Sequence, residues 1–188
     1  MELLIEEEKY TVEDFHKMES LDENHYYELI EGEIVKKNAP TPQHQAILGN
    51  INDILRTHVK SKNLGTVLFA PIDVFLDANN QLQPDLIFIA QEKKHIITSN
   101  GIEGVPTVVV EIISPSTGRY DRGNKMRVYK RHAVAEYWII DPKSQSVEIY
   151  VYRDGDYDLD SFAVENGNLI ITIFPELTLK AEDIFADI

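Results

Sequence analysis

Two strongly apolar segments, each interrupted by one acidic residue, constrain the fold of this chain more than any other feature. Residues 83–89 read QPDLIFI and residues 108–115 read VVVEIISP, so the two acids are Asp85 and Glu111. Near-continuous runs of β-branched and aromatic residues between turn signals are typical of strands buried on both faces. The sequence therefore predicts two interior strands that each carry a carboxylate.

A buried carboxylate needs a compensating partner, since an ionised acid inside a strand costs on the order of several kcal/mol. If the two strands pair antiparallel, the start of one lies beside the end of the other, and Asp85 and Glu111 meet at one edge of the sheet. The connection over residues 90–105 is long enough for other arrangements. Oxygen ligands of this kind suit Mg²⁺ or Mn²⁺. A hydrolytic metal site held by Asp85 and Glu111 is the leading hypothesis.

The composition excludes several other classes of site. The chain has 188 residues and no cysteine, which rules out disulfides, thiolate zinc sites and cysteine nucleophiles. It also lacks a nucleophile elbow and a glycine-rich phosphate loop. We expect one domain over residues 1–188. Acids in the first eight residues and the lack of a membrane-length apolar run favour a soluble, cytoplasmic protein.

The charge distribution is uneven. A net charge of −14 argues against general attraction to a phosphate backbone. Between residues 119 and 132, however, lie six of the 18 lysines and arginines, with Asp121 as the single acid. This stretch is interpreted either as a solvated helix face or as a local nucleic-acid-binding surface that includes Arg119, Arg122 and Arg127.

The order of predicted elements indicates an α/β or α+β domain with a mixed central sheet flanked by helices. Helices are predicted over residues 11–20, from Pro42 onward, over 121–132 and over 179–185. A hairpin is predicted from the strands 26–30 and 33–37. Further strands are predicted over 66–77, 84–89, 106–113, 136–141, 146–152, 157–163 and 169–173.

The helix that follows the Glu111 strand carries a candidate catalytic cation. Lys125 and Tyr129 are four residues apart and therefore share a helix face. A helix that packs back on the sheet can bring the Lys125 ammonium to Glu111, where it would hold an attacking water and offset developing charge. The alternative is a purely structural ion pair between Lys125 and Glu111. Asp85, likewise, could be a turn residue that accepts backbone hydrogen bonds.

Several residues are supporting candidates. His44 lies in a first helical turn, where it either has a structural role in capping and packing or belongs to the candidate metal site. Glu28 is either a supplementary ligand or an exposed acid, and we favour the exposed acid. Ser114 and Ser116 end the Glu111 strand and also offer hydroxyl groups near a phosphate. Asp73 lies in an apolar segment and is a further buried-acid candidate.

The combined pattern resembles the Uma-two-type restriction endonuclease family, formerly a domain of unknown function, within the PD-(D/E)XK nuclease superfamily. The resemblance covers nearly the whole chain. In chain order it rests on YELIEGE at 27–33, His44, Pro84-Asp85, EIISPST at 111–117, Asp121, Lys125, Tyr129 and EYWIID at 136–141.

The resemblance implies a restriction-endonuclease-like fold and a magnesium-dependent nuclease that cleaves DNA, with Asp85 and Glu111 as metal ligands and a homodimeric assembly. The superfamily places a lysine two residues after the strand glutamate, where this chain has Ile113. In the resembled family that lysine has moved to the following helix, which matches Lys125. Two alternatives stay open: a nuclease-like module that binds nucleic acid or assembles without cleaving, and an acidic homo-oligomer joined through residues 147–173.

Overall fold

A six-stranded mixed sheet forms the centre of the computed structural model, which describes residues 9–18, 21, 25–114 and 118–186. Its strand order is β11-β10-β9-β8-β6-β3, with β8 and β9 parallel and the other neighbours antiparallel. The strands are β3 (Gly65–Phe69), β6 (Leu86–Ala90), β8 (Val108–Ile112), β9 (Glu136–Asp141), β10 (Ser146–Arg153) and β11 (Asp156–Val164). The predicted mixed central sheet is confirmed.

A second sheet of five short strands has the order β2-β1-β5-β4-β7. Its strands are β1 (Tyr26–Ile30), β2 (Glu33–Lys37), β4 (Val74–Asp77), β5 (Asn80–Leu82) and β7 (Ile102–Glu103). The predicted hairpin is confirmed, and its turn has a positive φ at Glu31 (53°) and Gly32 (81°). Close to the carboxyl end, β12 (Asn168–Leu169) and β13 (Leu179–Lys180) pair with each other.

The helices are short apart from α2. They are α1 (Val12–His16), α2 (Pro42–Ser61), the 3-10 helix η1 (Gln91–Ile96), α3 (Gly118–Tyr120), the π-helical η2 (Asp121–Lys125), α4 (Met126–Arg131) and α5 (Ala181–Ile184). Helix α2 begins as predicted, since Pro42 occupies a first-turn position and the Thr41 side chain accepts a hydrogen bond from the His44 amide. No helix in the described part of the chain combines the length and apolar character that a bilayer crossing requires.

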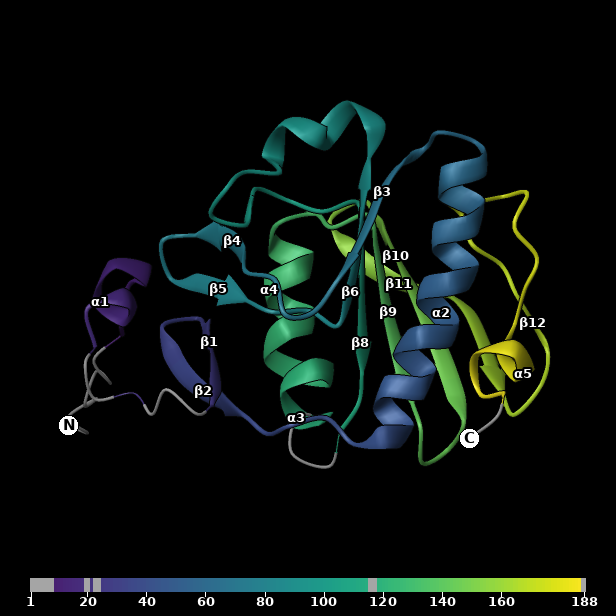
Figure 1. The fold of residues 1–188 in the computed structure, drawn as a ribbon, viewed down its shortest axis with the longest axis horizontal. Helices are drawn as coiled ribbons and strands as arrows, with labels where there is room; N and C mark the ends of the chain where they lie inside the picture. Colours follow the sequence, from purple (N-terminus) through teal and green to yellow (C-terminus); the bar gives the residue numbers. More distant parts are fainter. Residues whose placement is uncertain (1–8, 19–20, 22–24, 115–117, 187–188) are drawn as a thin grey trace.

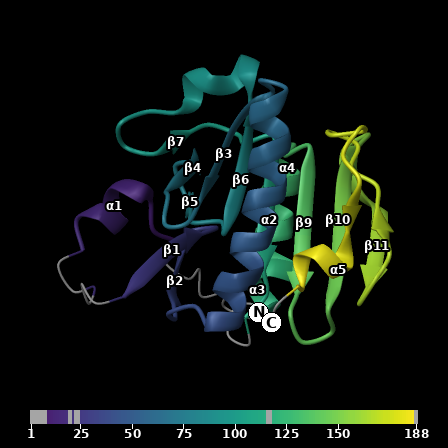
Figure 2. The same ribbon diagram turned by 45° about the vertical axis from the view of Figure 1, so that its right-hand side comes forward.

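Two apolar cores lie on opposite faces of the six-stranded sheet. Ile51 and Leu55 of α2 pack on one face against a cluster that includes Trp138 of β9. Val128 and Tyr129 of α4 belong to the cluster on the other face. Figures 1 and 2 show α2 and α4 on the two sides of β6, β8 and β9. Because strand side chains alternate, Glu111 shares a face with Val109 and is directed toward the α4 side.

Several predicted boundaries were wrong. The single strand expected over 66–77 is two strands, β3 and β4, which belong to different sheets. The segment between them contains Pro71, which has no N–H group to continue a strand ladder. Residues 169–173 contribute only Leu169 to β12, and the helix expected from 179 begins at Ala181. The strands β5 and β7 are too short to show an alternating apolar pattern, so the sequence did not predict them.

The pairing of β6 with β8 places the two acids together. The strands are antiparallel, with Leu86 opposite Val110. Asp85 immediately precedes β6 and Glu111 immediately follows Val110, so the start of β6 adjoins the carboxyl end of β8. This is the arrangement expected from antiparallel pairing of the two acid-bearing segments.

Candidate functional site

Glu111 is held by two donors from the neighbouring helical segment. One of its oxygens, Oε1, accepts hydrogen bonds from Lys125 Nζ at 2.9 Å and from the Tyr129 hydroxyl at 2.8 Å. Lys125 ends η2 and Tyr129 lies in α4, one turn later. Their four-residue spacing puts both side chains on the face that packs against β8, as predicted.

Lys125 lies at the centre of a buried acidic cluster. Its side chain is 1% exposed, and its Nζ lies 3.1 Å from Glu28 Oε1 and 3.4 Å from Asp121 Oδ1, in addition to Glu111. The π-helical turn Asp121–Lys125 carries both Asp121 and Lys125, and both are buried. Turns of this kind often occur at functional sites.

Asp85 is bound by the backbone and by a histidine. Its Oδ2 accepts a hydrogen bond from the Ile112 amide at 2.7 Å and lies 3.2 Å from His44 Nε2. His44 comes from the first turn of α2, and its Nδ1 is buried with no hydrogen-bond partner among the described residues. Asp85 is thus fixed from both sides, by β8 and by α2.

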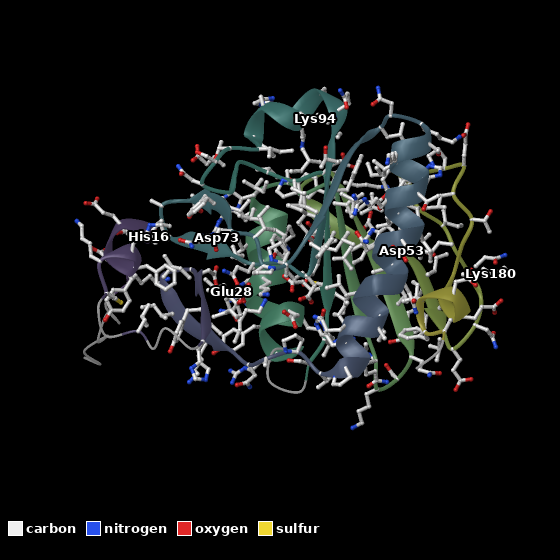
Figure 3. The ribbon with its side chains drawn as sticks, in the orientation of Figure 1. His16, Glu28, Asp53, Asp73, Lys94 and Lys180 are labelled. Carbon is white, nitrogen blue, oxygen red and sulfur yellow. The ribbon has the colours of Figure 1, made fainter. Side chains whose placement is uncertain are left out.

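The expectation that Glu28 is an exposed acid was wrong. It is 1% exposed, and its Oε1 accepts a hydrogen bond from the Gln83 amide at 2.7 Å. Lys37, on the partner strand β2, lies 3.7 Å from the same oxygen and donates to the Gln83 carbonyl at 2.7 Å. In Figure 3, Glu28 lies toward the interior, whereas Lys94 and Lys180 lie at the periphery. Glu28 is buried because β1 packs against the segment that leads into β6.

Burial and the neighbouring charges shift the pKa values of the acids and of the lysine in this cluster. Burial raises the pKa of Glu111 to about 8, with the neighbouring carboxylates adding to the rise and Lys125 opposing it. Burial also opposes the charged form of Lys125, but the surrounding carboxylates outweigh it and hold the Lys125 pKa well above its ordinary value. The acids involved are Glu28, Asp85, Glu111 and Asp121.

Asp85 has the opposite shift from Glu111. Burial raises its pKa, but the His44 hydrogen bond, the nearby Lys37 charge and the Ile112 amide lower it by more, so the pKa of Asp85 lies below its ordinary value. The two neighbouring carboxylates therefore differ at neutral pH, since Asp85 is ionised while Glu111 tends to retain a proton.

A pocket of about 520 Å³ opens onto these groups. Asp85, Glu111 and Lys125 all line it, together with His44, Lys37 and residues of the β2–α2 connection. Ser114 also lines this pocket. Water and a small substrate group can therefore reach the carboxylates from one side.

The donors on the pocket fit a divalent cation of the magnesium type. Within the described ranges, no group of three or more His, Cys, Asp or Glu side chains is arranged so that it could hold a metal ion by itself. Mg²⁺ does not need such a group, because it is commonly bound by one or two carboxylates and keeps waters or substrate phosphate as its remaining ligands. Asp85 and Glu111 supply two carboxylates to this pocket, and burial together with the neighbouring acids raises the pKa of Glu111.

The remaining candidates lie outside this cluster. Asp73 is half-buried rather than buried, and it accepts a hydrogen bond from the Gln83 side-chain amide at 2.9 Å. Ser116 lies outside the described residues. Arg119 is exposed, while Arg122 pairs with Glu148 at 2.6 Å. Arg127 pairs with Glu31 at 2.8 Å.

Three residues of the cluster were missed or misjudged in the sequence-based prediction. Asp121 and Lys37 received no site role, and Glu28 was a supporting candidate for which we favoured an exposed acid. A signal existed for two of them: Asp121 is four residues before Lys125, and Glu28 shares a strand face with the buried Ile30. Lys37 had no comparable signal, since its role depends on how the β1–β2 hairpin packs.

The six-stranded mixed sheet has helices on both faces. Two acids lie at adjoining strand ends, and a lysine reaches them from the following helical segment. Together these features define a restriction-endonuclease-like fold. A solved structure supports this class: "a putative nuclease belonging to DUF820" from Anabaena variabilis has a TM-score of 0.74 and 21% sequence identity, over 94% of this chain and 97% of that one. At this level of identity the likeness shows the fold.

The sequence places the chain more narrowly. The Uma2 family, described as "Putative restriction endonuclease", matches residues 12–182, and the chain belongs to this family.

Two curated relatives come from Synechocystis sp. The uncharacterized protein slr1290 is 44% identical over 55 residues, and the match spans 28% of each chain. The uncharacterized protein sll1609 is 23% identical over 125 residues, or 65% of this chain and 70% of that protein.

Proposed function

We propose that this protein is a metal-dependent endonuclease that hydrolyses phosphodiester bonds in DNA. The observation that carries the proposal is the meeting of Asp85, Glu111 and Lys125 on one pocket, in a chain of the Uma2 family. Asp85 and Glu111 would hold Mg²⁺ or Mn²⁺. When bound, such a cation activates water and polarises the phosphoryl oxygen.

The side chains then have separate tasks. In the hydrolysis, a water oxygen forms a bond to phosphorus while the bond from phosphorus to the leaving oxygen breaks. The attacking water gives up one proton to solvent in the pocket, and the leaving oxygen takes up one proton from solvent. The Lys125 ammonium would hold the attacking water and offset the charge that develops on the phosphoryl group. Tyr129 and Asp121 position Lys125 and Glu111, and His44 orients Asp85.

Lys125 can also replace the superfamily lysine that is missing at position 113, where this chain has Ile113. The ammonium lies 2.9 Å from Glu111, although it comes from the following helical segment. Only the position of the charge matters to the chemistry, so Ile113 by itself does not favour a non-cleaving module. Arg119, Arg122 and Arg127 are proposed contacts to the nucleic-acid backbone.

Plasmid nicking tests the proposal. We expect Mg²⁺ or Mn²⁺ to support conversion of supercoiled plasmid to the open form, and chelator to abolish it. Asp85→Asn is expected to reduce the rate at least about a hundredfold, since even outer-shell partners of a metal are worth about 10- to 100-fold. Asp53→Asn is the matched control, because Asp53 is exposed on α2 and does not line the pocket. Equal nicking by wild type and Asp85→Asn would refute the assignment, and plasmid binding without nicking would favour the non-cleaving module.

We also propose a homodimer joined through β11 and its surroundings. Strand β11 is an edge of the six-stranded sheet, and large apolar side chains are exposed on it and beside it. They are Leu159, Phe162, Val164 and Ile170. Light scattering is expected to give twice the 21.5 kDa chain mass, and Phe162→Glu to give the single mass. A monomeric wild type would exclude this assembly.

A further inference from the structure

We infer that the substrate enters this site as an unpaired strand, with one base stacked on Tyr26 at the pocket mouth and its phosphate beside Lys37. The inference rests on the proposed nuclease function and names its substrate class, single-stranded DNA. It is carried by the shape of the pocket, the chemistry of its rim and the distribution of charge around it.

The carboxylates lie at the bottom of a recess. Asp85 is 7% exposed and Glu111 is 2% exposed, and both line the pocket of about 520 Å³. A scissile phosphate must therefore enter the recess to reach them. A base that stacks on a protein ring at the pocket mouth must first leave its own duplex stack, which costs a few kcal/mol and costs least where the strand is already single. An unpaired strand, or a transiently unpaired segment of a negatively supercoiled plasmid, meets this condition without that cost.

The rim of the pocket suits a nucleoside. Tyr26 lines the pocket and is 55% exposed, so an incoming base can reach its side chain. Ala39, Pro40 and Pro71 add apolar surface to the same pocket. Aromatic side chains that stack on bases are the recurring device of proteins that bind single strands without sequence preference.

Lys37 supplies a cation next to this platform. Tyr26 and Lys37 are directly opposite partners on β1 and β2, so their side chains project from the same face of the hairpin. Lys37 is mostly buried and is fixed by the Gln83 carbonyl, and it also lines the pocket. A base on Tyr26 would thus have its phosphate beside an ammonium group that is already positioned.

The rest of the surface does not favour a duplex. The net charge is −14, and two of the three arginines proposed as backbone contacts face carboxylates, Arg122 facing Glu148 and Arg127 facing Glu31, so few cations are left to neutralise a long duplex. Duplex binding draws most of its affinity from cations that neutralise many phosphates. Recognition through one stacked base and one lysine needs far fewer cations.

Fluorescence anisotropy and cleavage with two labelled probes test the inference. One probe is an oligo-dT, which has no secondary structure, and the other is a blunt hairpin duplex of the same length. We expect the oligo-dT to bind at least about tenfold more tightly and to be cleaved with the higher kcat/KM. Tyr26→Ala is expected to weaken oligo-dT binding and raise its KM about tenfold, since a stacked base is worth about 1–3 kcal/mol. Tyr26→Trp should restore both values.

Ile97→Ala is the matched control, because Ile97 is an exposed apolar residue (37%) that neither lines the pocket nor belongs to the proposed dimer surface. It is expected to leave oligo-dT affinity unchanged. Binding is measured with the Asp85→Asn protein, so it can be read even if no probe is cleaved. Absence of cleavage by wild type would refute the proposed function alone. Equal or tighter duplex binding, or an unchanged oligo-dT affinity in Tyr26→Ala, would overturn the inference.

Discussion

Replacing Lys125 with methionine is expected to lower the free energy of unfolding by about 3–5 kcal/mol, the usual result of removing one partner from a buried ion pair. The loss is large because Lys125 forms ion pairs with several buried acids. Its ammonium lies within 3.4 Å of Glu28, Glu111 and Asp121, all of which are buried. Methionine keeps the length of the side chain but leaves these carboxylates without that charge.

Urea unfolding, followed by circular dichroism, measures this loss. Lys130→Met is the matched control, because Lys130 pairs with the exposed Asp156 and such surface pairs are worth at most about 1 kcal/mol. The loss in Lys125→Met is expected to shrink toward about pH 5, because Glu111, whose pKa burial raises to about 8, is then protonated and no longer needs a counter-charge. A Lys125→Met protein within about 1 kcal/mol of wild type would contradict the central role given to this lysine.

Replacing Glu111 with glutamine is expected to abolish metal-dependent cleavage while making the metal-free protein no less stable at neutral pH. Glutamine keeps an oxygen that can accept from Lys125 and Tyr129, but it removes a carboxylate whose burial is costly. Because burial raises the pKa of Glu111 to about 8, the folded protein holds a proton that the unfolded chain loses above the ordinary glutamate value. The stability contributed by this group therefore falls as pH rises between these two values.

The comparison of pH profiles measures this effect. From about pH 5 to pH 8, wild type is expected to lose at least about 1 kcal/mol more than Glu111→Gln, since one pKa unit corresponds to about 1.4 kcal/mol. Plasmid cleavage by Glu111→Gln should fall at least about a hundredfold, because a direct metal ligand is worth at least as much as its outer-shell partners. Parallel pH profiles would contradict the raised pKa, and wild-type cleavage would contradict the ligand role.

The sequence allowed the geometry of the acids to be predicted because strand identity and pairing direction follow from local patterns. The segments around Asp85 and Glu111 are apolar enough to be recognised as interior strands, and antiparallel pairing leaves one place for the two acids to meet. The position of Lys125 followed from the four-residue periodicity of a helix that must return to the sheet. Each of these steps depends on residues close together in the chain.

The parts that the sequence did not predict depend on packing between distant segments. Glu28 is buried because the β1–β2 hairpin contacts the residues before β6, and the Gln83 amide then binds its carboxylate. Lys37 enters the site by the same contact. The break between β3 and β4 is a second case, since residues 66–77 are mostly apolar and only Pro71 indicated that the ladder could not continue.

The central claim, that Asp85 and Glu111 together hold a divalent cation beside Lys125, is tested most directly by crystals soaked in Mn²⁺. We expect an anomalous peak about 2 Å from carboxylate oxygens of both acids, within the pocket lined by His44 and Lys125. Loss of the peak in crystals of Glu111→Gln would agree with it. Saturating Mn²⁺ that gives no peak between the two acids, or a peak elsewhere in a protein that still cleaves DNA, would contradict it.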